Sequence, residues 1–133
     1  MPESFDGTWW SVILPPSWSG HADGECGTFQ SSPPLGALQI SSARRDIGPV
    51  TDDDLRDFAA ERITSGIRPE NAAYGPFVGF SVEYRKGQHF WKEWWLRSEG
   101  LMIYATYNIK GRDFLEKEDV ERILSSLKPT SGA

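Results

Sequence analysis

The first third of the chain alternates apolar and polar residues in a way that predicts three strands. Residues 9–14 form an apolar, β-rich run that two prolines close, because proline cannot donate a hydrogen bond to a neighbouring strand. Residues 25–31 lie between an Asp-Gly pair and a Pro-Pro pair, which favours a short edge strand. Residues 35–42 alternate Leu38 and Ile40 with smaller or polar residues, the pattern of a half-buried strand.

Two later segments have a helical period instead. Thr51 precedes three aspartates, a variant of the capping box with acidic side chains at the positive end of a new helix. Helical spacing then continues until Gly66 supplies a stop, through the apolar residues Leu55, Phe58, Ala59 and Ile63. The same spacing predicts a second helix before Pro129, from Val120, Ile123, Leu124 and Leu127.

Residues 77–109 predict a meander of three strands with two turns. A three-residue loop that ends at Gly87, the residue best able to take the left-handed conformation, pairs Val82 with Phe90. A two-residue turn at Glu99 and Gly100 pairs Leu96 with Ile103 and Trp95 with Tyr104. With these turns, the apolar side chains of neighbouring strands point to the same face of the sheet. A slip of one residue would send them to opposite faces.

That register sorts the meander into two faces. One face is predicted to be the core under both helices, with Lys92 as its only charge: Val78, Phe80, Val82, Tyr84, Phe90, Trp94, Leu96, Leu101, Ile103, Ala105 and Tyr107. The other, the mixed face, combines rings with polar groups: Phe77, Ser81, Glu83, Trp91, Glu93, Trp95, Arg97, Met102, Tyr104, Thr106 and Asn108. A buried face would carry fewer charges, and a plain solvent face would carry fewer rings.

Two interpretations of the mixed face stay open. In the first it is a binding surface, because tryptophan and tyrosine offer a large rigid contact area while polar neighbours fix orientation. The candidate binding residues are then Phe77, Trp91, Glu93, Trp95, Arg97, Tyr104, Thr106 and Asn108. In the second, residues 9–14 or the loop over residues 16–32 fold across the rings and form another core layer.

Length and composition fit a single domain over residues 1–133, since no linker or composition shift divides the chain. Six Trp, seven Phe and four Tyr supply a core of large rings. The predicted fold class is α+β, with a mostly antiparallel six-stranded sheet in the order βββ-α-βββ-α and two amphipathic helices. Residues 1–7 and 130–133 are expected to fray.

Charge and cysteine content limit the classes of partner and the cellular compartment that we expect. The 14 basic and 19 acidic residues give a net charge of −5, which disfavours nucleic acid and anionic lipid surfaces. The single cysteine closes no disulfide within the chain, and the N-terminus lacks the pattern of a signal peptide, so a cytoplasmic location is expected. No apolar run approaches the roughly 20 residues of a membrane span, which predicts no integral membrane association.

The sequence contains no pattern typical of a catalytic, metal or cofactor site. His21, Asp23, Glu25 and Cys26 share one segment, but their spacing matches no zinc or calcium motif and is typical of a polar turn. No nucleophile elbow, dinucleotide fingerprint, P-loop or zinc-protease motif occurs. Glu83 shares its predicted face with a second glutamate, but such pairs are common on solvated sheets. We therefore expect no cofactor, no metal and no enzymatic activity.

The order of elements resembles the PsbP/Mog-like fold group. Residues 12–18, Val-Ile-Leu-Pro-Pro-Ser-Trp, are similar to that group's strand with a Pro-Trp turn, and residues 120–128 are similar to its closing helix with a Ser-Leu-Lys end. The group includes photosystem accessory proteins, partners of nuclear-transport GTPases and bacterial chaperones that hold type VI secretion effectors on a sheet face, often as dimers. The resemblance implies a non-enzymatic binding role, and its chaperone-like branch suits a bacterial cytosolic chain.

Three functional hypotheses follow. The leading one is an adaptor or chaperone-like module that binds another protein through the mixed face, with a homodimer among the expected states. The second is a small immunity protein whose acidic surface, including Asp53 and Asp57, neutralises a basic toxin. The third is a protein or enzyme that binds a small molecule between the sheet and residues 16–32.

Overall fold

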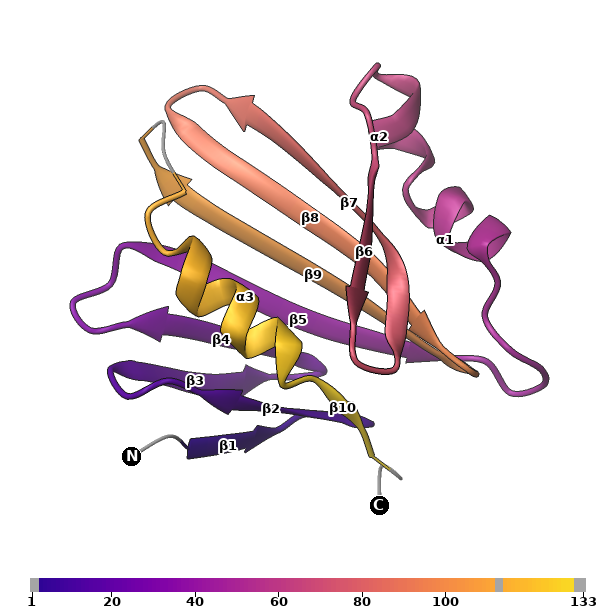
Figure 1. The fold of residues 1–133 in the computed structure, drawn as a ribbon, viewed down its shortest axis with the longest axis horizontal. Coiled ribbons are helices and arrows are strands. Elements are labelled where there is room, and N and C mark those ends of the chain that lie inside the picture. Colours follow the sequence, from indigo (N-terminus) through magenta and orange to yellow (C-terminus); the bar gives the residue numbers. More distant parts are fainter. Residues whose placement is uncertain (1–2, 112–113, 131–133) are drawn as a thin grey trace.

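A computed structural model of the chain describes residues 3–111 and 114–130 (Figure 1). Its helices are α1 (Asp52–Phe58), α2 (Ala60–Thr64) and α3 (Lys117–Ser125). Its strands are β1 (Glu3–Asp6), β2 (Trp10–Leu14), β3 (Trp18–Asp23), β4 (Cys26–Ser31), β5 (Gly36–Arg44), β6 (Glu70–Tyr74), β7 (Phe77–Lys86), β8 (His89–Ser98), β9 (Leu101–Lys110) and β10 (Lys128–Pro129). The predicted α+β class with mostly antiparallel strands is confirmed.

The strands form two sheets instead of the single six-stranded sheet predicted. Within the described residues, the large sheet has seven strands in the order β3-β4-β5-β9-β8-β7-β6, and every neighbouring pair is antiparallel. The small sheet joins β2 to β1 on one side and to β10 on the other. Strand β4 is not an edge strand, because the unpredicted β3 lies outside it.

Both ends of the described chain pair with β2 or with the residue before it, including residues 3–6, where the sequence predicts fraying. Glu3 pairs with Leu14 in β1, and the backbone amide of Thr130 donates to the carbonyl of Trp9 at 2.8 Å. Residues 1–2 and 131–133 of the predicted frayed ends lie outside the described residues.

The first predicted helix is divided in two. Its capping box is confirmed: the Thr51 hydroxyl accepts from the Asp54 amide at 3.2 Å, and the Asp54 carboxylate accepts from the Thr51 amide at 2.9 Å. At Ala59 the backbone leaves the helical conformation, with φ −93° and ψ 3°, so α1 ends and α2 begins. The predicted C-terminal helix is α3.

The register of the meander is predicted correctly at one turn and wrongly at the other. Leu96 pairs with Ile103 across β8 and β9, as the Glu99-Gly100 turn predicts. Across β7 and β8, however, Val82 pairs with Glu93 and not with Phe90. The loop is two residues long, Gly87 and Gln88, because Lys86 and His89 still pair. The resulting shift is an odd number of residues, so it turns β7 over relative to the prediction.

The large sheet is covered on both faces, as two neighbouring tryptophans of β8 show. Trp94 lies in the first core, together with the buried residues of α3 and β2. Trp95 lies in the second core, against Leu55 and Ala59 at α1. Successive residues of a strand point to opposite faces, so α3 and α1 cover opposite faces of one sheet. In Figure 1, α3 crosses in front of the sheet, whereas α1 and α2 stand beside β7.

The prediction that both helices cover one face is therefore wrong, and four residues of β7 change sides. Phe80, Val82 and Tyr84 belong to the second core or pack against it, and Val78 lines a hollow on the same face, although we predicted all four under the helices with Trp94. Phe77 moves the other way and is fully buried in the first core. The cause is the inverted register of β7, not a failure of the strand prediction.

Candidate functional site

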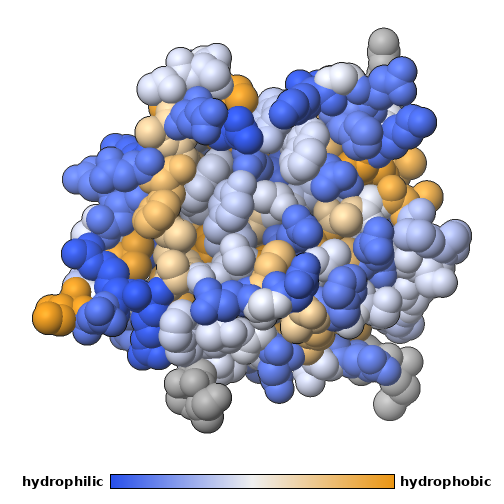
Figure 2. Space-filling view, turned by 180° about the vertical axis from the view of Figure 1, so that it is seen from behind, coloured by the Kyte–Doolittle hydropathy of each residue, from blue (hydrophilic) through white to orange (hydrophobic). Residues whose placement is uncertain are grey.

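The candidate site lies on the second face, which we define as the face of the large sheet opposite α3. Helix α1 and the residues next to it cover Phe80, Val82, Trp95 and Met102 there. Beyond these residues the face stays open over β5, β9 and part of β8, where Gln39 is exposed. Figure 2 looks at the molecule from this side and shows pale, tan and blue side chains intermixed, without one continuous apolar surface.

The structure brings four of the eight predicted site residues to the surface of this face. Trp91, Arg97, Tyr104 and Asn108 are half-buried. Three others are on the same face but are buried: Glu93 is 2% exposed, Trp95 3% and Thr106 9%. Phe77 was assigned to this face wrongly, because it lies in the first core. Helix α1 and its neighbouring residues cover one part of the mixed face, and the other part stays open. The prediction that residues 9–14 or residues 16–32 cover the rings is wrong, because Trp10, Val12 and Leu14 pack in the first core and β3 and β4 belong to the large sheet.

A buried carboxylate organises the boundary between the covered and open parts. Nε of Arg62, which α2 supplies, donates to Oε1 of Glu93 at 2.6 Å. The Tyr84 hydroxyl donates to the same oxygen at 3.1 Å, and the Tyr104 hydroxyl donates to Oε2. Three donors from α2, β7 and β9 therefore converge on one side chain of β8. Such charge-assisted bonds compensate the cost of burying the carboxylate and hold the three donors in place.

The same cluster changes the acidity of its members. The hydrogen bond to Glu93 raises the pKa of Arg62 above its usual range. Burial, followed by the charge of Glu93, raises the pKa of Tyr84 to about 12. Burial and the hydrogen bond to Glu93 also raise the pKa of Tyr104. Each shift favours the state that binds Glu93, which is a cationic guanidinium or a neutral phenol.

All four tyrosines of the chain are expected to resist ionisation while the protein is folded. Burial raises the pKa of Tyr74 and Tyr107 as well as that of Tyr84 and Tyr104. At about pH 11, roughly nine in ten tyrosines of an unfolded chain are ionised. The native protein should therefore show only a small phenolate absorbance at this pH, and addition of urea should reveal the rest.

The raised pKa values of the tyrosines also set the direction in which the stability of the protein depends on pH. Neutral phenols are favoured in the folded state, so their contribution is complete below about pH 10 and is lost as the pH rises through the folded-state values. The free energy of unfolding should fall between about pH 10 and the pKa of Tyr84, which is about 12. Tyrosines that titrate in the native protein as they do in urea would contradict the buried Glu93 cluster.

Aromatic rings continue from this cluster toward the open part of the face. The ring planes of Tyr84 and Trp91 are 2° apart, with their centroids separated by 6.3 Å. The guanidinium of Arg62 lies 5.0 Å from the centroid of the Tyr84 ring. Beside them is a hollow of about 300 Å³ whose lining includes Ser41, Phe58 and Tyr104. Phe58 is 63% exposed at this hollow, so the open face has both flat rings and a recess.

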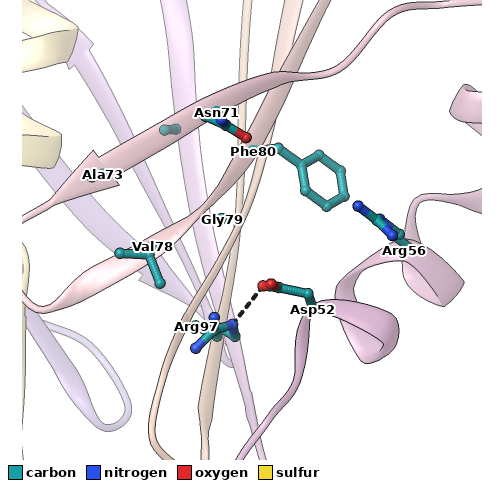
Figure 3. Close-up of a pocket in the computed structure, with 9 residues that line it drawn as sticks. Asp52, Arg56, Asn71, Ala73, Val78, Gly79, Phe80 and Arg97 are labelled. Carbon is teal, nitrogen blue, oxygen red and sulfur yellow. Dashed lines mark hydrogen bonds and ion pairs between the residues drawn. The ribbon is translucent and has the colours of Figure 1, made fainter.

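Arg97 lies in a different hollow, near the first turn of α1 (Figure 3). Its Nε donates to Oδ1 of Asp52 at 2.7 Å. This hydrogen bond lowers the pKa of Asp52 below its usual range. The predicted site residues on this face therefore form two groups, one around Glu93 and one around Arg97. The buried Trp95 ring lies in the second core on the same face.

The sequence prediction missed the residues that other elements bring to this face. Tyr84 was assigned to the opposite face through the wrong register, and the helix period gave no sign that Arg62 reaches a buried carboxylate. Asp52 and Arg56 of α1 line the hollow at Arg97, which the helical period of this segment does not indicate. A two-residue loop at Gly87 and Gln88 was the signal that would have placed Tyr84 correctly.

The polar segment around His21 and Cys26 forms the end of a hairpin. Asp23 and Cys26 pair at the end of the β3–β4 hairpin, and His21 and Glu25 are exposed nearby. Among residues 3–111 and 114–130, no group of three or more histidine, cysteine or acidic side chains is placed to hold a metal ion. None of the helices described has the length and apolar character required to cross a bilayer.

Comparison with known proteins shows a likeness of fold. No family model matches the chain, and no curated protein sequence matches it. A crystal structure from Bacteroides thetaiotaomicron is similar over 96% of this chain, with a TM-score of 0.69 and 14% identity. This chain spans about half of that one, 48% of its length.

A second likeness covers both chains almost completely. The solution structure of the cyanobacterial PsbP protein, CyanoP, from Synechocystis sp. PCC 6803 is similar over 97% of this chain and 92% of its own length. The TM-score is 0.60 and the identity is 15%. Identities this low carry the fold and not the function. The chain has a PsbP-like fold, as the two short motifs at its ends predicted.

Proposed function

We propose that this chain is a non-enzymatic protein-binding module, an adaptor or a chaperone-like protein, that uses the open part of the second face. The observation that carries the proposal is the stacked pair of Tyr84 and Trp91. It lies beside the edge of the second core and is only half-buried. Large rings of this kind, set among polar groups, are typical of the energetically important centres of protein interfaces.

The rigidity of the site supports this proposal. Glu93 fixes the hydroxyl of Tyr84 and the guanidinium of Arg62, and Arg62 in turn lies over the Tyr84 ring. A ring that is already held in one orientation loses little side-chain entropy when a partner covers it. The open face therefore offers contact area at a low entropic cost, which is the physical requirement for a binding surface.

The surroundings of the rings fit a protein partner better than a small substrate. Gln39 is exposed, and Asn108 and Ser41 are half-buried, so polar groups border the aromatic centre. The recess next to Phe58 is open to the surface. Its charged lining residues are Glu61 and Arg62, and the charge of Arg62 is already bound to Glu93. A sheet-face mode is also what the resemblance of the sequence motifs to the chaperone-like branch of the fold group implies.

The test is affinity capture with photo-crosslinking from the native cell, comparing the unchanged chain with Trp91→Ala. Truncation of a central ring should reduce partner recovery about tenfold or more, as at other interface centres. The matched control is Leu115→Ala, because Leu115 is 69% exposed and immediately precedes Glu116 at the start of α3. Equal recovery by a folded Trp91→Ala protein would count against this face. Light scattering on the same samples reports whether the partner is a second copy.

A further inference from the structure

The large sheet ends in a free edge at β6. This strand pairs with β7 on one side, and no other strand among the described residues pairs with it. An edge strand presents backbone amides and carbonyls in a row, which is a template for another extended chain. Most of β6 is exposed, so nothing within residues 3–111 and 114–130 buries this edge completely.

A hollow of about 400 Å³ lies beside that edge, between β6, β7 and α1 (Figure 3). Asn71 and Ala73 of β6 pair with Phe80 and Val78 of β7, so these four side chains share the second face and line the hollow. Val78 is 39% exposed there. The sheet side of the hollow is therefore partly apolar and open, as needed to receive side chains of an added strand.

Two arginines supply the polar side of the hollow. Arg97 binds Asp52 through Nε, and within the described part of the chain its two terminal guanidinium nitrogens have no hydrogen-bond partner. Arg56, one turn along α1 from Asp52, makes no ion pair among the residues that the structure describes. Figure 3 shows Arg56 and Asp52 reaching from α1 toward the sheet, with Asp52 directed at Arg97. Two cations and one anion leave the hollow with a net positive charge on a chain whose total is −5.

We propose that an extended segment of a partner protein adds to β6 and places a carboxylate side chain between Arg56 and Arg97. Alternate residues of an added strand would face the hollow, because side chains alternate along a strand. One acidic residue would reach the guanidinium groups, which bind carboxylates through paired hydrogen bonds. A small apolar residue two positions away would contact Ala73, which pairs with Val78 of β7.

Asp52 acts as an internal competitor in this arrangement. It binds Nε of Arg97. Because the Asp52 side chain is 65% exposed, breaking this ion pair costs little free energy. Removing the charge of Asp52 frees a donor and also removes repulsion toward an incoming carboxylate. The substitution Asp52→Asn should therefore strengthen binding, an effect that damage to the fold would not produce.

The test uses a synthetic peptide with Val, Glu and Val at alternate positions and Thr between them, titrated into the whole chain. Arg56→Ala and Arg97→Gln should each weaken binding about fivefold or more, and Asp52→Asn should tighten it about threefold. Asp53→Asn is the matched control, since it changes the net charge equally but does not line the hollow, and it should leave the affinity unchanged. Higher salt should weaken binding, because these contacts are near the surface.

Hydrogen exchange separates strand addition from simple anion binding. The peptide should slow amide exchange in β6 and leave β3, at the opposite end of the sheet, unaffected. A peptide with Gln in place of Glu should bind more weakly, and glutarate should compete poorly. Equal binding of both peptides, unchanged affinity of the arginine variants, or competition by glutarate without protection of β6 would each overturn the proposal. These variants share no residue with the Trp91 test, so the two proposals stand or fall separately.

Discussion

Replacing Trp95 with alanine is expected to lower the free energy of unfolding by about 3–5 kcal/mol, the usual cost of truncating a buried aromatic residue. Trp95 is 3% exposed and contacts the rings of Phe80 and Tyr104, with centroids at 5.6 and 5.5 Å. The cavity left under α1 would remain largely unfilled, because the sheet below it is rigid. Urea denaturation followed by far-ultraviolet circular dichroism measures the change.

The matched control is the same substitution at Trp91, on the same strand and the same face. Trp91 is half-buried, and its stack with Tyr84 is expected to contribute about 0.5–1.5 kcal/mol. The comparison tests how the helices divide the second face. Equal losses at the two positions would show that α1 and α2 do not distinguish a covered part from an open one.

The second large loss of stability is expected when Glu116, on the other side of the large sheet, is substituted. Its carboxylate accepts hydrogen bonds from the Gly36 amide at 3.0 Å, from the Tyr107 hydroxyl at 2.7 Å and from the Ser31 hydroxyl. Glu116→Ala leaves at least two buried donors without an acceptor, at about 1–3 kcal/mol each. The expected loss is about 2–6 kcal/mol in the free energy of unfolding, measured by urea denaturation.

Glu118→Ala is the control for this change, because Glu118 is exposed two residues further along and carries the same charge. Its effect should stay within about 0.5 kcal/mol. Glu116→Gln keeps one acceptor oxygen and should lie between the two alanine variants. Similar losses at positions 116 and 118 would mean that the effect comes from net charge and not from the hydrogen bonds to β4, β5 and β9.

Local signals predicted several elements of this fold correctly. The Thr51 capping box fixes where α1 begins, and the spacing of Val120 to Leu127 predicts α3, because both depend on neighbouring residues alone. The Glu99-Gly100 turn sets the β8–β9 register in the same way. Strands β3 and β6 were missed because they contain few apolar residues, and pairing with β4 and β7 holds them in place.

The faces of β7 could not be predicted from its own residues. Phe77, Phe80 and Val82 are all buried, but in two different cores, so the strand shows no simple alternation between core and solvent. Only the loop length at Gly87 decides between the two registers, and loops of two and three residues are both compatible with a glycine there. Where a sheet is buried on both sides, the usual period-two signal disappears.

The candidate site was predictable in part, for a related reason. Strand alternation correctly placed Trp91, Trp95 and Tyr104 on one face, because they follow each other along β8 and across a correctly registered pair. It could not show that α1 seals Trp95, or that Arg62 of α2 reaches Glu93. Those contacts join segments that are far apart in the sequence, and no local period records them.

The double burial of β8 has a consequence for the divergence of this protein. From Phe90 to Leu96, almost every side chain is buried on one side of the sheet or the other, and the buried charges of Lys92 and Glu93 are each paired with a more exposed partner. A mutation at any of these positions disrupts packing or a buried ion pair on one side of the sheet or on both. We expect homologues to keep the ring-and-charge pattern of this strand long after the exposed hairpins have drifted beyond recognition.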